Sequence, residues 1–511
     1  MNTPKPPLNI LLEMRPALEG HAGIPQETRL LFRGLSMLDN VRVEGLLQSG
    51  DQLLARGLPP SGKGWFGPLS TDRQVNRLGR VVITLEQRKW AKKGDTPKRR
   101  SWFSAVKVTA YTVAMALWHT VGGSQALRRF DAHNFRDYIW RRFFARTLPP
   151  ADFDLVTRAG FRIARIPWGA MHICAQFTRH FGPPIYARLD TSDYDIMIAE
   201  TPYPATVSRK TTLVVRYHDA IPVLMPHTIS DRSHHQASHY WALRNNVNNG
   251  AWFVCVSDAT RNDLLSIFPQ AAPRSLTIHN MVSHDYFDED SSADRVPEII
   301  KTRLNAKIKP PLDPSFTRRL FEGGSGSEPL QYLLIVSTIE PRKNHLTLLS
   351  AWERLRVELF PELKLIVVGE IGWRQKSIVQ KFRPWMERGD AFLVENVPSP
   401  DLRLLYKHAR ATICPSFGEG FDFSGVEAMK SGGAVIASDI AVHREIYADA
   451  AEYFNPYSVG DLARAIQDVI GPARSVRRDE LVANGALVAQ RYAYEVILPQ
   501  WQAFLNSRSA Q

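Results

Sequence analysis

The chain has 511 residues, of which 44% are hydrophobic and 23% charged, and this composition excludes a disordered protein. The three cysteines are too few for a disulfide framework or a four-cysteine zinc site, so a reducing compartment fits best. The 64 lysines and arginines outnumber the 51 aspartates and glutamates, which gives a formal net charge of +13. This surplus favours polyanionic partners, among them nucleic acid, anionic lipid and phosphorylated substrates.

The first residues predict the start of an α/β domain. Leu8–Glu13 is a strand-like apolar run, Gly20 and Gly23 lie in the loop that follows, and Pro25 opens a helical stretch. Two glycines at such a turn let backbone N–H groups approach an anion, although many turns need glycine for geometry alone. Further short strands alternate with helical stretches, which indicates a mostly parallel sheet. These strands are expected at Val41–Leu47, Asp195–Ala199, Thr212–Arg216, Trp252–Val256 and Ser275–Ile278.

Residues from about 64 to 181 are basic, aromatic-rich and irregular, which predicts an insertion in this first domain. Within it, Ser104–Trp118 is apolar but too short for a membrane span, and it contains Lys107. It follows a run of lysines and arginines, so two interpretations stay open: an element on a membrane surface, or a buried helix. The amino terminus has no apolar signal-peptide core, which indicates a cytoplasmic location.

The carboxyl-terminal half predicts a second doubly wound α/β domain. We expect a first domain over 1–290, a linker or mobile loop rich in proline, glycine and serine over 291–330, and this second domain over 331–490. A final amphipathic helix over 491–511 could pack back on the first domain. The strands of the second domain are expected at Tyr332–Val336, Leu363–Val368, Ala391–Val394, Ala411–Cys414 and Ala434–Ala437.

The most informative stretch is PSFGEGFDFSGVEAMKSGGAVIASD, residues 415–439. Glu419 lies on a glycine-containing loop and Glu427 in the first turn of the helix expected from about Ser424, so both carboxylates can point into one cleft. The glycines of this stretch let the backbone approach a ligand, and the helix N-terminus offers N–H groups to a phosphate. The alternative is ordinary: Glu427 complements the helix dipole, and the glycines only form turns.

This stretch, with its E-x7-E spacing, resembles the donor-site signature of family-4 retaining glycosyltransferases of the GT-B fold. STIEPRKNHLTLLSAWERL, residues 337–355, is similar to the family segment that carries a diphosphate-binding lysine. MRPALEGHAGIPQETRLLFRGL, residues 14–35, resembles a bacterial surface-polysaccharide branch, and VVRYHDAIPVLMP, residues 214–226, matches the acceptor-side histidine segment. The resemblance covers both domains except the region from about 64 to 181. It implies an α/β architecture of two Rossmann-like domains that face an interdomain cleft.

The resemblance also implies roles for individual residues. Glu419 would bind hydroxyls of the donor sugar, Lys343 would neutralise the donor diphosphate, and His218 would lie near the reacting carbon. Glu427 would bind the nucleotide ribose, and Gly23 would approach the phosphates from the first domain. Arg342 is the candidate for a second cation, because many family members carry an arginine where this chain has a threonine, five residues before the lysine. The other residues implied at the donor site are Phe421, Asp422, Ser424, Gly425, Val426 and Val397.

The functional hypothesis is a retaining glycosyltransferase that moves a hexose from a nucleotide-diphosphate sugar to a glycan or lipid-linked glycan in surface polysaccharide synthesis. The resemblance favours mannose from GDP-mannose, without a cofactor, and a peripheral location on the inner face of the cytoplasmic membrane. Two alternatives stay open: a nucleotide-sugar epimerase or hydrolase of the same fold, and a non-catalytic sugar- or membrane-binding protein.

Other chemistry is not favoured by the sequence. His234, His235 and His239 include an i, i+4 pair, but no third ligand is evident, so they are interpreted as a solvated helix face. The D-x-D patterns at 193–195 and 288–290 lie at a strand start and beside the linker, so no metal is proposed. No recognised nucleic-acid module is found, and no nucleic-acid partner is expected.

Overall fold

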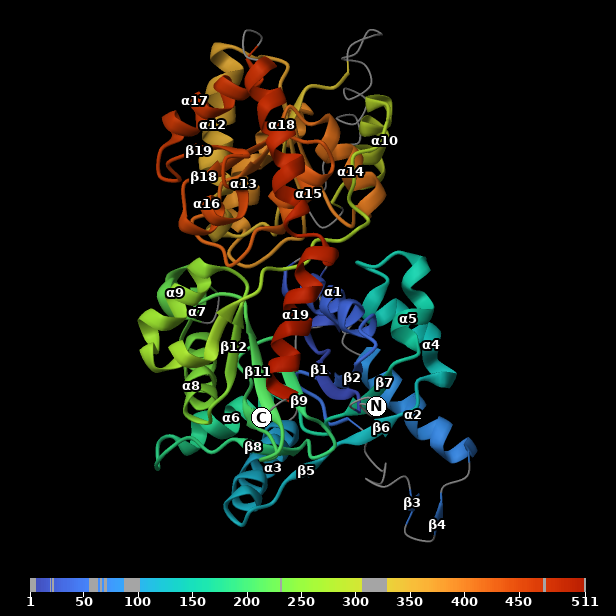
Figure 1. The fold of residues 1–511 in the computed structure, drawn as a ribbon. Helices are drawn as coiled ribbons and strands as arrows, with labels where there is room; N and C mark the ends of the chain where they lie inside the picture. Colours follow the sequence, from blue (N-terminus) through green and yellow to red (C-terminus); the bar gives the residue numbers. More distant parts are fainter. Residues whose placement is uncertain are drawn as a thin grey trace.

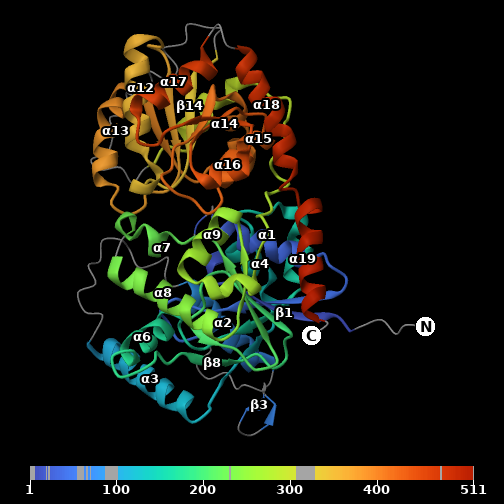
Figure 2. The same ribbon diagram turned by 60° about the vertical axis from the view of Figure 1, so that its left-hand side comes forward.

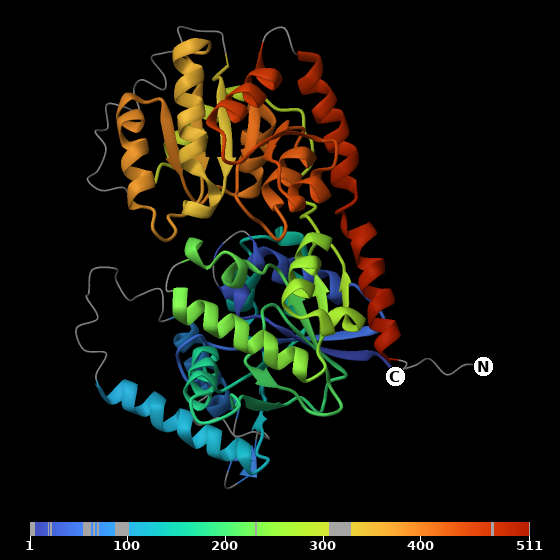
Figure 3. The same ribbon diagram turned by 90° about the vertical axis from the view of Figure 1, so that its left-hand side faces the viewer.

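The computed structural model describes residues 6–18, 20, 23–54, 63–64, 67–68, 71–86, 102–229, 232–305, 329–471 and 475–509. It contains two large sheets, one built by each half of the chain, with helices around both (Figure 1). The two halves lie one above the other and meet along one side of each (Figures 1 and 3).

The amino-terminal sheet has eight strands, and every pairing in it is parallel except that of β6 with β7. Strand β1 is buried along almost its whole length, as expected for a central strand of a parallel sheet covered on both faces. The strands are, in spatial order, β13 (Ser275–Thr277), β12 (Trp252–Cys255), β11 (Thr212–Tyr217), β9 (Ile196–Ala199), β1 (Leu8–Glu13), β2 (Val41–Leu47), β7 (Gly160–Ile163) and β6 (Arg128–Phe130).

Helices surround this sheet, and several of them position the residues discussed below. The helices are α1 (Ile24–Ser36), α2 (Thr71–Glu86), α3 (Trp102–Thr120), α4 (Arg136–Ile139), α5 (Phe153–Thr157), α6 (Trp168–Thr178), α7 (Ile221–Leu224), α8 (Arg232–Asn248) and α9 (Asp258–Ile267). The short strands β8 (Ala187–Asp190), β5 (Gln125–Ala126) and β10 (Ala205–Thr206) form a small separate sheet.

The region expected as an irregular insertion contributes to the main sheet. Strand β7 pairs in parallel with β2, and β6 extends the sheet on its outer side. An ion pair fixes this edge, because the Arg162 guanidinium lies 2.7 Å from the Glu44 carboxylate on β2. The sequence GFRI gave too short an apolar signal to predict the strand, whereas tertiary pairing stabilises it. Residues 55–62, 65–66, 69–70 and 87–101, which include part of the basic run, lie outside the described residues.

The carboxyl-terminal sheet has six strands, all paired in parallel. Along β14, Leu333 and Ile335 pack in one core while Tyr332 and Leu334 pack in another, so both faces of the sheet are buried. The strands are β16 (Ala391–Val394), β15 (Lys364–Val368), β14 (Tyr332–Val336), β17 (Ala411–Cys414), β18 (Val435–Ser438) and β19 (Ala451–Phe454). The helices are α12 (His345–Glu358), α13 (Lys376–Arg388), α14 (Ser399–His408), α15 (Phe423–Lys430), α16 (Ala441–Tyr447), α17 (Val459–Ile470) and α18 (Ser475–Gln490).

Part of the segment expected as a linker is built into this second sheet. Helix α10 (Val296–Thr302) packs on α14, and Leu304 bridges to Val394 at the sheet edge. The Asn305 N–H donates to the Leu393 carbonyl at 2.9 Å. The stretch VPEII was too short to predict a helix on its own, and burial against α14 stabilises it. Residues 306–328 lie outside the described residues.

The last helix, α19 (Tyr494–Ser509), runs back along the amino-terminal half (Figure 2). Trp501 is fully buried, and the Arg216 guanidinium lies over its ring at 5.3 Å. Phe504 contacts Trp252 at 5.9 Å between ring centroids. This apolar packing ties the end of the chain to the first sheet.

Loops after the strands of one half touch loops after the strands of the other. Gly420, which follows β17, lies so close to the His218 carbonyl that an added Cβ would be 1.6 Å from its oxygen. The Ser257 hydroxyl donates to the Gly420 carbonyl at 2.8 Å. Because these loops follow parallel strands, the carboxyl edges of the two sheets face each other, which is where open α/β sheets bind ligands.

A second contact between the halves involves Glu445 on α16. Its two oxygens accept the backbone N–H groups of Asp258 and Ala259 at 2.7 and 2.9 Å, at the amino end of α9. His279 Nε2 lies 2.8 Å from the same carboxylate. Glu445 therefore caps a helix of the opposite half, and these contacts hold the halves together.

Candidate active site

The loop after β17 carries Glu419 against two cations. The Lys343 Nζ lies 2.5 Å from one carboxylate oxygen, and the Arg342 guanidinium lies 2.7 Å from the other. Both cations come from η9 (Pro341–Lys343), the turn that follows β14, and Arg342 also donates to the Gly418 carbonyl at 2.6 Å. Strands β14 and β17 are neighbours, so their carboxyl-end loops bring these three predicted residues together.

This cluster keeps its charges. Burial alone would raise the pKa of Glu419, but the charges of Arg342 and Lys343 hold it below the ordinary value for glutamate. Burial would lower the pKa of Arg342, but Glu419 and Glu340 hold it above the ordinary value. The carboxylate and the guanidinium are therefore ionised at neutral pH, and the cations are available to a competing anion.

Asp422 caps the helix that follows this loop. One of its oxygens accepts the Ser424 N–H at 3.2 Å and the Ser424 hydroxyl at 2.6 Å. His443 Nε2 lies 3.3 Å from the other oxygen. Burial opposes the charge, but His443 and Lys343 hold the pKa of Asp422 well below its ordinary range. The helix thus begins at Phe423 with a fixed negative charge at its amino end.

Protein contacts occupy several of the groups that the sequence assigned to the donor. The Ser424 N–H is donated to Asp422, and Phe421 packs against the rings of Phe423 and Tyr492. An added Cβ at Gly425 would lie 2.3 Å from Tyr447, so this glycine permits close packing of that ring. Gly425 was expected to let the backbone approach a ligand. In the structure the absence of a side chain there makes room for Tyr447.

Glu427 reaches across to the other half of the molecule. It is 4% exposed, and its Oε1 accepts the Gln26 side-chain N–H at 2.7 Å while its Oε2 accepts the Tyr406 hydroxyl at 3.1 Å. Burial raises the pKa of Glu427 to about 7. The interaction with Gln26 was not foreseen, since a glutamine in a helical stretch carries no distinguishing pattern.

A cavity of about 510 Å³ lies beside this contact and is lined by both halves. Gln26 and Arg146 line it from the first half, and Glu427, Thr338 and Val397 line it from the second. Two residues predicted for the donor site, Glu427 and Val397, therefore share one cavity. Gly23 is not among the lining residues; it precedes α1 with a φ of 71°, and Gly20 of the same loop lines the cavity instead.

On the first half, His218 follows β11 and faces the Glu200 carboxyl group, with 3.1 Å between Nε2 and Oε2. Burial lowers the pKa of His218 to about 4, so its imidazole is neutral at physiological pH. Glu200 and Glu27 are fully buried, and Glu27 pairs with the buried Arg216 at 3.0 Å. Sequence reasoning missed these partners, although a glutamate directly after the strand of Ile196–Ala199 was a usable signal.

No group of three histidine, cysteine or acidic side chains suited to a metal ion is found among the residues that the structure describes. His234 and His235 are exposed on α8, whereas His239 lies 3.4 Å from the Tyr217 hydroxyl.

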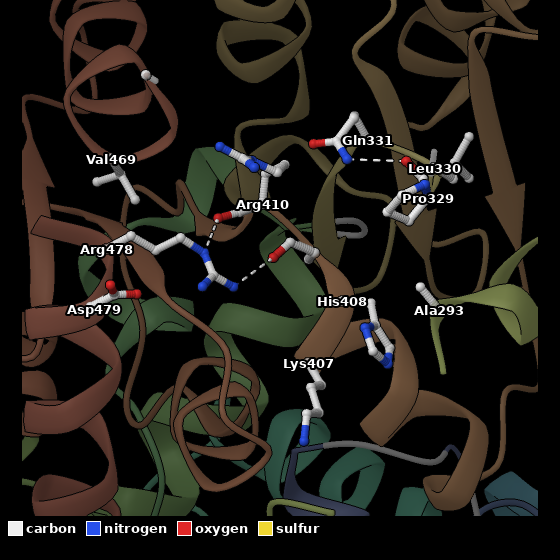
Figure 4. Close-up of a pocket in the computed structure, with 12 residues that line it drawn as sticks. Ala293, Pro329, Leu330, Gln331, Lys407, His408, Arg410, Val469, Arg478 and Asp479 are labelled. Atoms are coloured by element: carbon white, nitrogen blue, oxygen red, sulfur yellow. Dashed lines mark hydrogen bonds between the residues drawn. The ribbon is translucent and has the colours of Figure 1, made fainter. Parts of the chain in front are cut away.

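A second cavity, of about 530 Å³, lies at the opposite edge of the carboxyl-terminal sheet (Figure 4). Gln331 and Arg410, which line it, directly precede β14 and β17, so it lies at the amino ends of these strands. Arg478 donates to the carbonyls of Arg410 and Ala409, as the dashed lines in Figure 4 show. This cavity is separate from the cluster around Glu419.

The two facing parallel sheets define the GT-B fold of glycosyltransferases. Residues 321–484 match the family model described as glycosyl transferases group 1, so this part of the chain is a domain of that family. Sucrose-phosphate synthase from Thermosynechococcus elongatus has a similar fold, with a TM-score of 0.56 over 99% of this chain and 100% of that chain, at 13% sequence identity.

The chain is also similar in sequence to two mannosyltransferases of Escherichia coli. O-antigen chain mannosyltransferase B is 27% identical over 50% of this chain and 60% of its own length. The serotype-specific mannosyltransferase WbdA is 36% identical over 26% of this chain and 17% of its own length. The chain therefore covers less than two thirds of either relative.

Proposed function

We propose that this protein is a retaining mannosyltransferase that uses GDP-mannose and extends a glycan or lipid-linked glycan in surface polysaccharide synthesis. The observation that carries the proposal is the pair of salt bridges from Lys343 and Arg342 to Glu419, in the loops that abut His218. The similarity to O-antigen mannosyltransferases supports the choice of mannose and of this class of acceptor.

In this proposal the diphosphate of the donor binds Lys343 and Arg342, which exchange part of their contact with Glu419 for the anion. Glu419 then accepts hydroxyls of the sugar, and the neutral imidazole of His218 contacts the sugar near the reacting carbon. Glu427 accepts ribose hydroxyls in place of the Gln26 amide. Val397 borders the base in the cavity. The phosphates and the sugar are surrounded by Gly23, by Asp422 and by the backbone of Phe421, Ser424, Gly425 and Val426.

The proposed step breaks the bond between C1 of the sugar and the diphosphate oxygen and forms a bond between C1 and an acceptor hydroxyl oxygen. The acceptor attacks from the face that the diphosphate leaves, so the anomeric configuration is retained. The acceptor proton moves to the departing diphosphate. Fixed cations stabilise the negative charge that develops on the leaving group, and closure of the two halves excludes water that would intercept the sugar.

The test incubates the full chain with GDP-mannose, GDP-glucose, UDP-glucose and UDP-N-acetylglucosamine, with and without O-antigen-type acceptors. We expect nucleotide release that depends on acceptor, is fastest with GDP-mannose, and yields an α-linked product by NMR. Release without acceptor would indicate a hydrolase, and a changed sugar on the nucleotide an epimerase. Binding without turnover on any acceptor would favour a non-catalytic protein.

We also propose that the protein works in the cytoplasm, on the inner face of the cytoplasmic membrane. No described helix is long and apolar enough to cross a membrane. Helices α3 and α6 pack together at the end of the first half that lies away from the second half (Figure 3). Large apolar side chains are exposed there, and we call them the α3–α6 surface: Leu117, Trp118, Val121, Ile173, Phe177 and Phe181. Exposed apolar side chains on a protein of net positive charge suit an anionic lipid surface.

Vesicle pelleting tests this location. We expect the protein to pellet with phosphatidylglycerol vesicles and Trp118→Ser/Phe181→Ser to lose most of that binding, because both side chains are more than half exposed. Val357→Ser is the matched control, since Val357 is an exposed apolar side chain on α12 of the other half. Equal pelleting of all three proteins would contradict the proposed surface.

A further inference from the structure

Glu200 is a fully buried carboxyl group whose charged form is stabilised less by Arg216 and the Thr28 hydroxyl than it is opposed by burial. It directly follows β9, its side chain is fully buried, and its Oε1 has no hydrogen-bond partner among the residues that the structure describes. Its Oε2 lies 3.1 Å from His218 Nε2. Its backbone N–H donates to the Glu13 carboxylate at 3.0 Å, so a second carboxylate lies against it.

The surrounding charges leave Glu200 without a cation of its own. Arg15 pairs with Glu13 at 2.9 Å, and Arg216 pairs with Glu27 at 3.0 Å. Within the described part of the chain, two guanidinium groups therefore serve two other carboxylates of this cluster. Burial without a full set of hydrogen-bond partners disfavours an ionised carboxylate, and a neutral carboxyl group avoids that desolvation penalty.

The protonation of the pair agrees with this geometry. Burial raises the pKa of Glu200 to about 8, with Arg216 opposing the rise and Glu13 adding to it. Burial also lowers the pKa of His218 to about 4. At neutral pH both groups are uncharged. A carboxyl proton on Oε2 has Nε2 as its acceptor at 3.1 Å, whereas Oε1 has no hydrogen-bond partner among the described residues.

We propose that Glu200 is a positioning residue for His218: its neutral carboxyl group donates a hydrogen bond to Nε2 and fixes the imidazole tautomer that carries its proton on Nδ1. The second ring nitrogen, Nδ1, is then a hydrogen-bond donor instead of an acceptor. A carboxylic acid that burial keeps neutral is an effective donor of this kind. The inference rests on the proposed function for its use, since an Nδ1–H would serve oxygen atoms of the donor sugar or diphosphate.

The tautomer is measured directly by NMR of the full chain labelled with ¹⁵N-histidine. The His218 signal is assigned by its loss in His218→Gln. We expect the Nδ1–H tautomer in the wild type at about pH 7, and its retention in Glu200→Gln, because the glutamine amide N–H also donates to Nε2. Glu200→Leu should give a mixture of tautomers. An Nε2–H tautomer in the wild type, or loss of the Nδ1–H form in Glu200→Gln, overturns the proposal.

Kinetics supply the second measurement. Glu200→Gln should keep kcat within about twofold of the wild type at neutral pH, and Glu200→Leu should lower kcat about tenfold with little change in the KM of GDP-mannose. As the pH rises through about 8, the wild type should lose activity because Glu200 ionises, and Glu200→Gln should not. An equal alkaline decline in both proteins overturns the proposal.

The comparison of these two proteins isolates one group among several. The charged and titratable groups that act on the pair are Glu13, Glu27, Arg216 and Asp219, and Arg15 pairs with Glu13 beside them. All of them are the same in both proteins. The matched control is Glu44→Gln, a buried carboxylate on β2 that accepts from Arg162 and Tyr194 and contacts no histidine in the described structure. It should leave both the tautomer and the alkaline limb unchanged.

The two measurements separate this inference from the proposed function. The tautomer is observed without turnover, so the predicted tautomer in a chain that transfers no sugar would contradict only the proposed function. An active chain with the Nε2–H tautomer would contradict only the role of Glu200.

Discussion

The titratable side chains at the two facing sheet edges differ in their ionisation at neutral pH. On the second half, Glu419 and Arg342 stay ionised, because an opposite charge lies within 3 Å of each and outweighs the effect of burial on its pKa. On the first half, burial leaves His218 and Glu200 uncharged at neutral pH. Burial alone therefore does not set the protonation of a carboxyl group: two cations offset the effect of burial at Glu419, whereas burial dominates at Glu200.

This difference suits a substrate with a charged end and a neutral end. A diphosphate is bound by cations that remain charged, whereas the hydroxyl groups of a sugar are bound by neutral hydrogen-bond donors and acceptors. The proposed function places each part of the donor against the edge that matches it.

Removing a cation that contacts Glu419 should have the largest effect on catalysis. Lys343→Ala should lower kcat about 100- to 1000-fold, because one fixed charge opposite the leaving group is lost. Initial rates of nucleotide release measure this. Lys364→Ala is the control, since Lys364 pairs with Asp390 at 2.6 Å away from the site. A Lys343→Ala rate within about twofold of the wild type would remove the charged edge from the mechanism.

Substitution of Glu427, which contacts Gln26 of the other half, should have the next largest effect. Glu427→Ala should weaken binding of GDP about tenfold, because a ribose acceptor is lost, and should change kcat less. Isothermal titration calorimetry measures the affinity. Glu353→Ala is the control, a carboxylate on α12 that accepts from Trp385. Equal affinity of wild type and Glu427→Ala for GDP would contradict the ribose role.

Glu427 also predicts how stability depends on pH. Its pKa is raised to about 7 in the folded protein, so the stabilisation it contributes is present at acidic pH and is lost as the pH rises through about 7. Glu427→Gln cannot ionise, so its Tm should fall less than that of the wild type between about pH 5 and pH 8. Thermal melts of both proteins test this, and parallel curves would show that Glu427 titrates normally.

The smallest expected effect concerns the contact that holds the two edges together. Glu445→Ala removes the cap of α9 and the contact with His279, and should lower the free energy of unfolding by about 1 kcal/mol. It should also widen the molecule in small-angle X-ray scattering. Asp439→Ala is the control, because Asp439 forms an exposed ion pair with Arg444 on the same half. An unchanged radius of gyration in Glu445→Ala would show that other contacts maintain closure.

The sequence predicted the central strands well because they are long apolar runs, as at Leu8–Glu13 and Tyr332–Val336. It failed at β7 and α10, which are short and owe their stability to neighbours distant in the chain. The assigned roles of the site residues remain predictions. The structure adds that Arg342, Lys343 and Glu419 lie together, and that Phe421 and Gly425 also pack against aromatic rings.

The α/β class and the residue types at the ends of the strands can be predicted from the amino-acid sequence, because hydrophobic periodicity and local motifs are properties of neighbouring residues. The pairing of these residues with one another depends on the three-dimensional fold. Gln26 meets Glu427 and Glu200 meets His218 through folding of segments far apart in the chain, and their protonation follows from burial that no local pattern records.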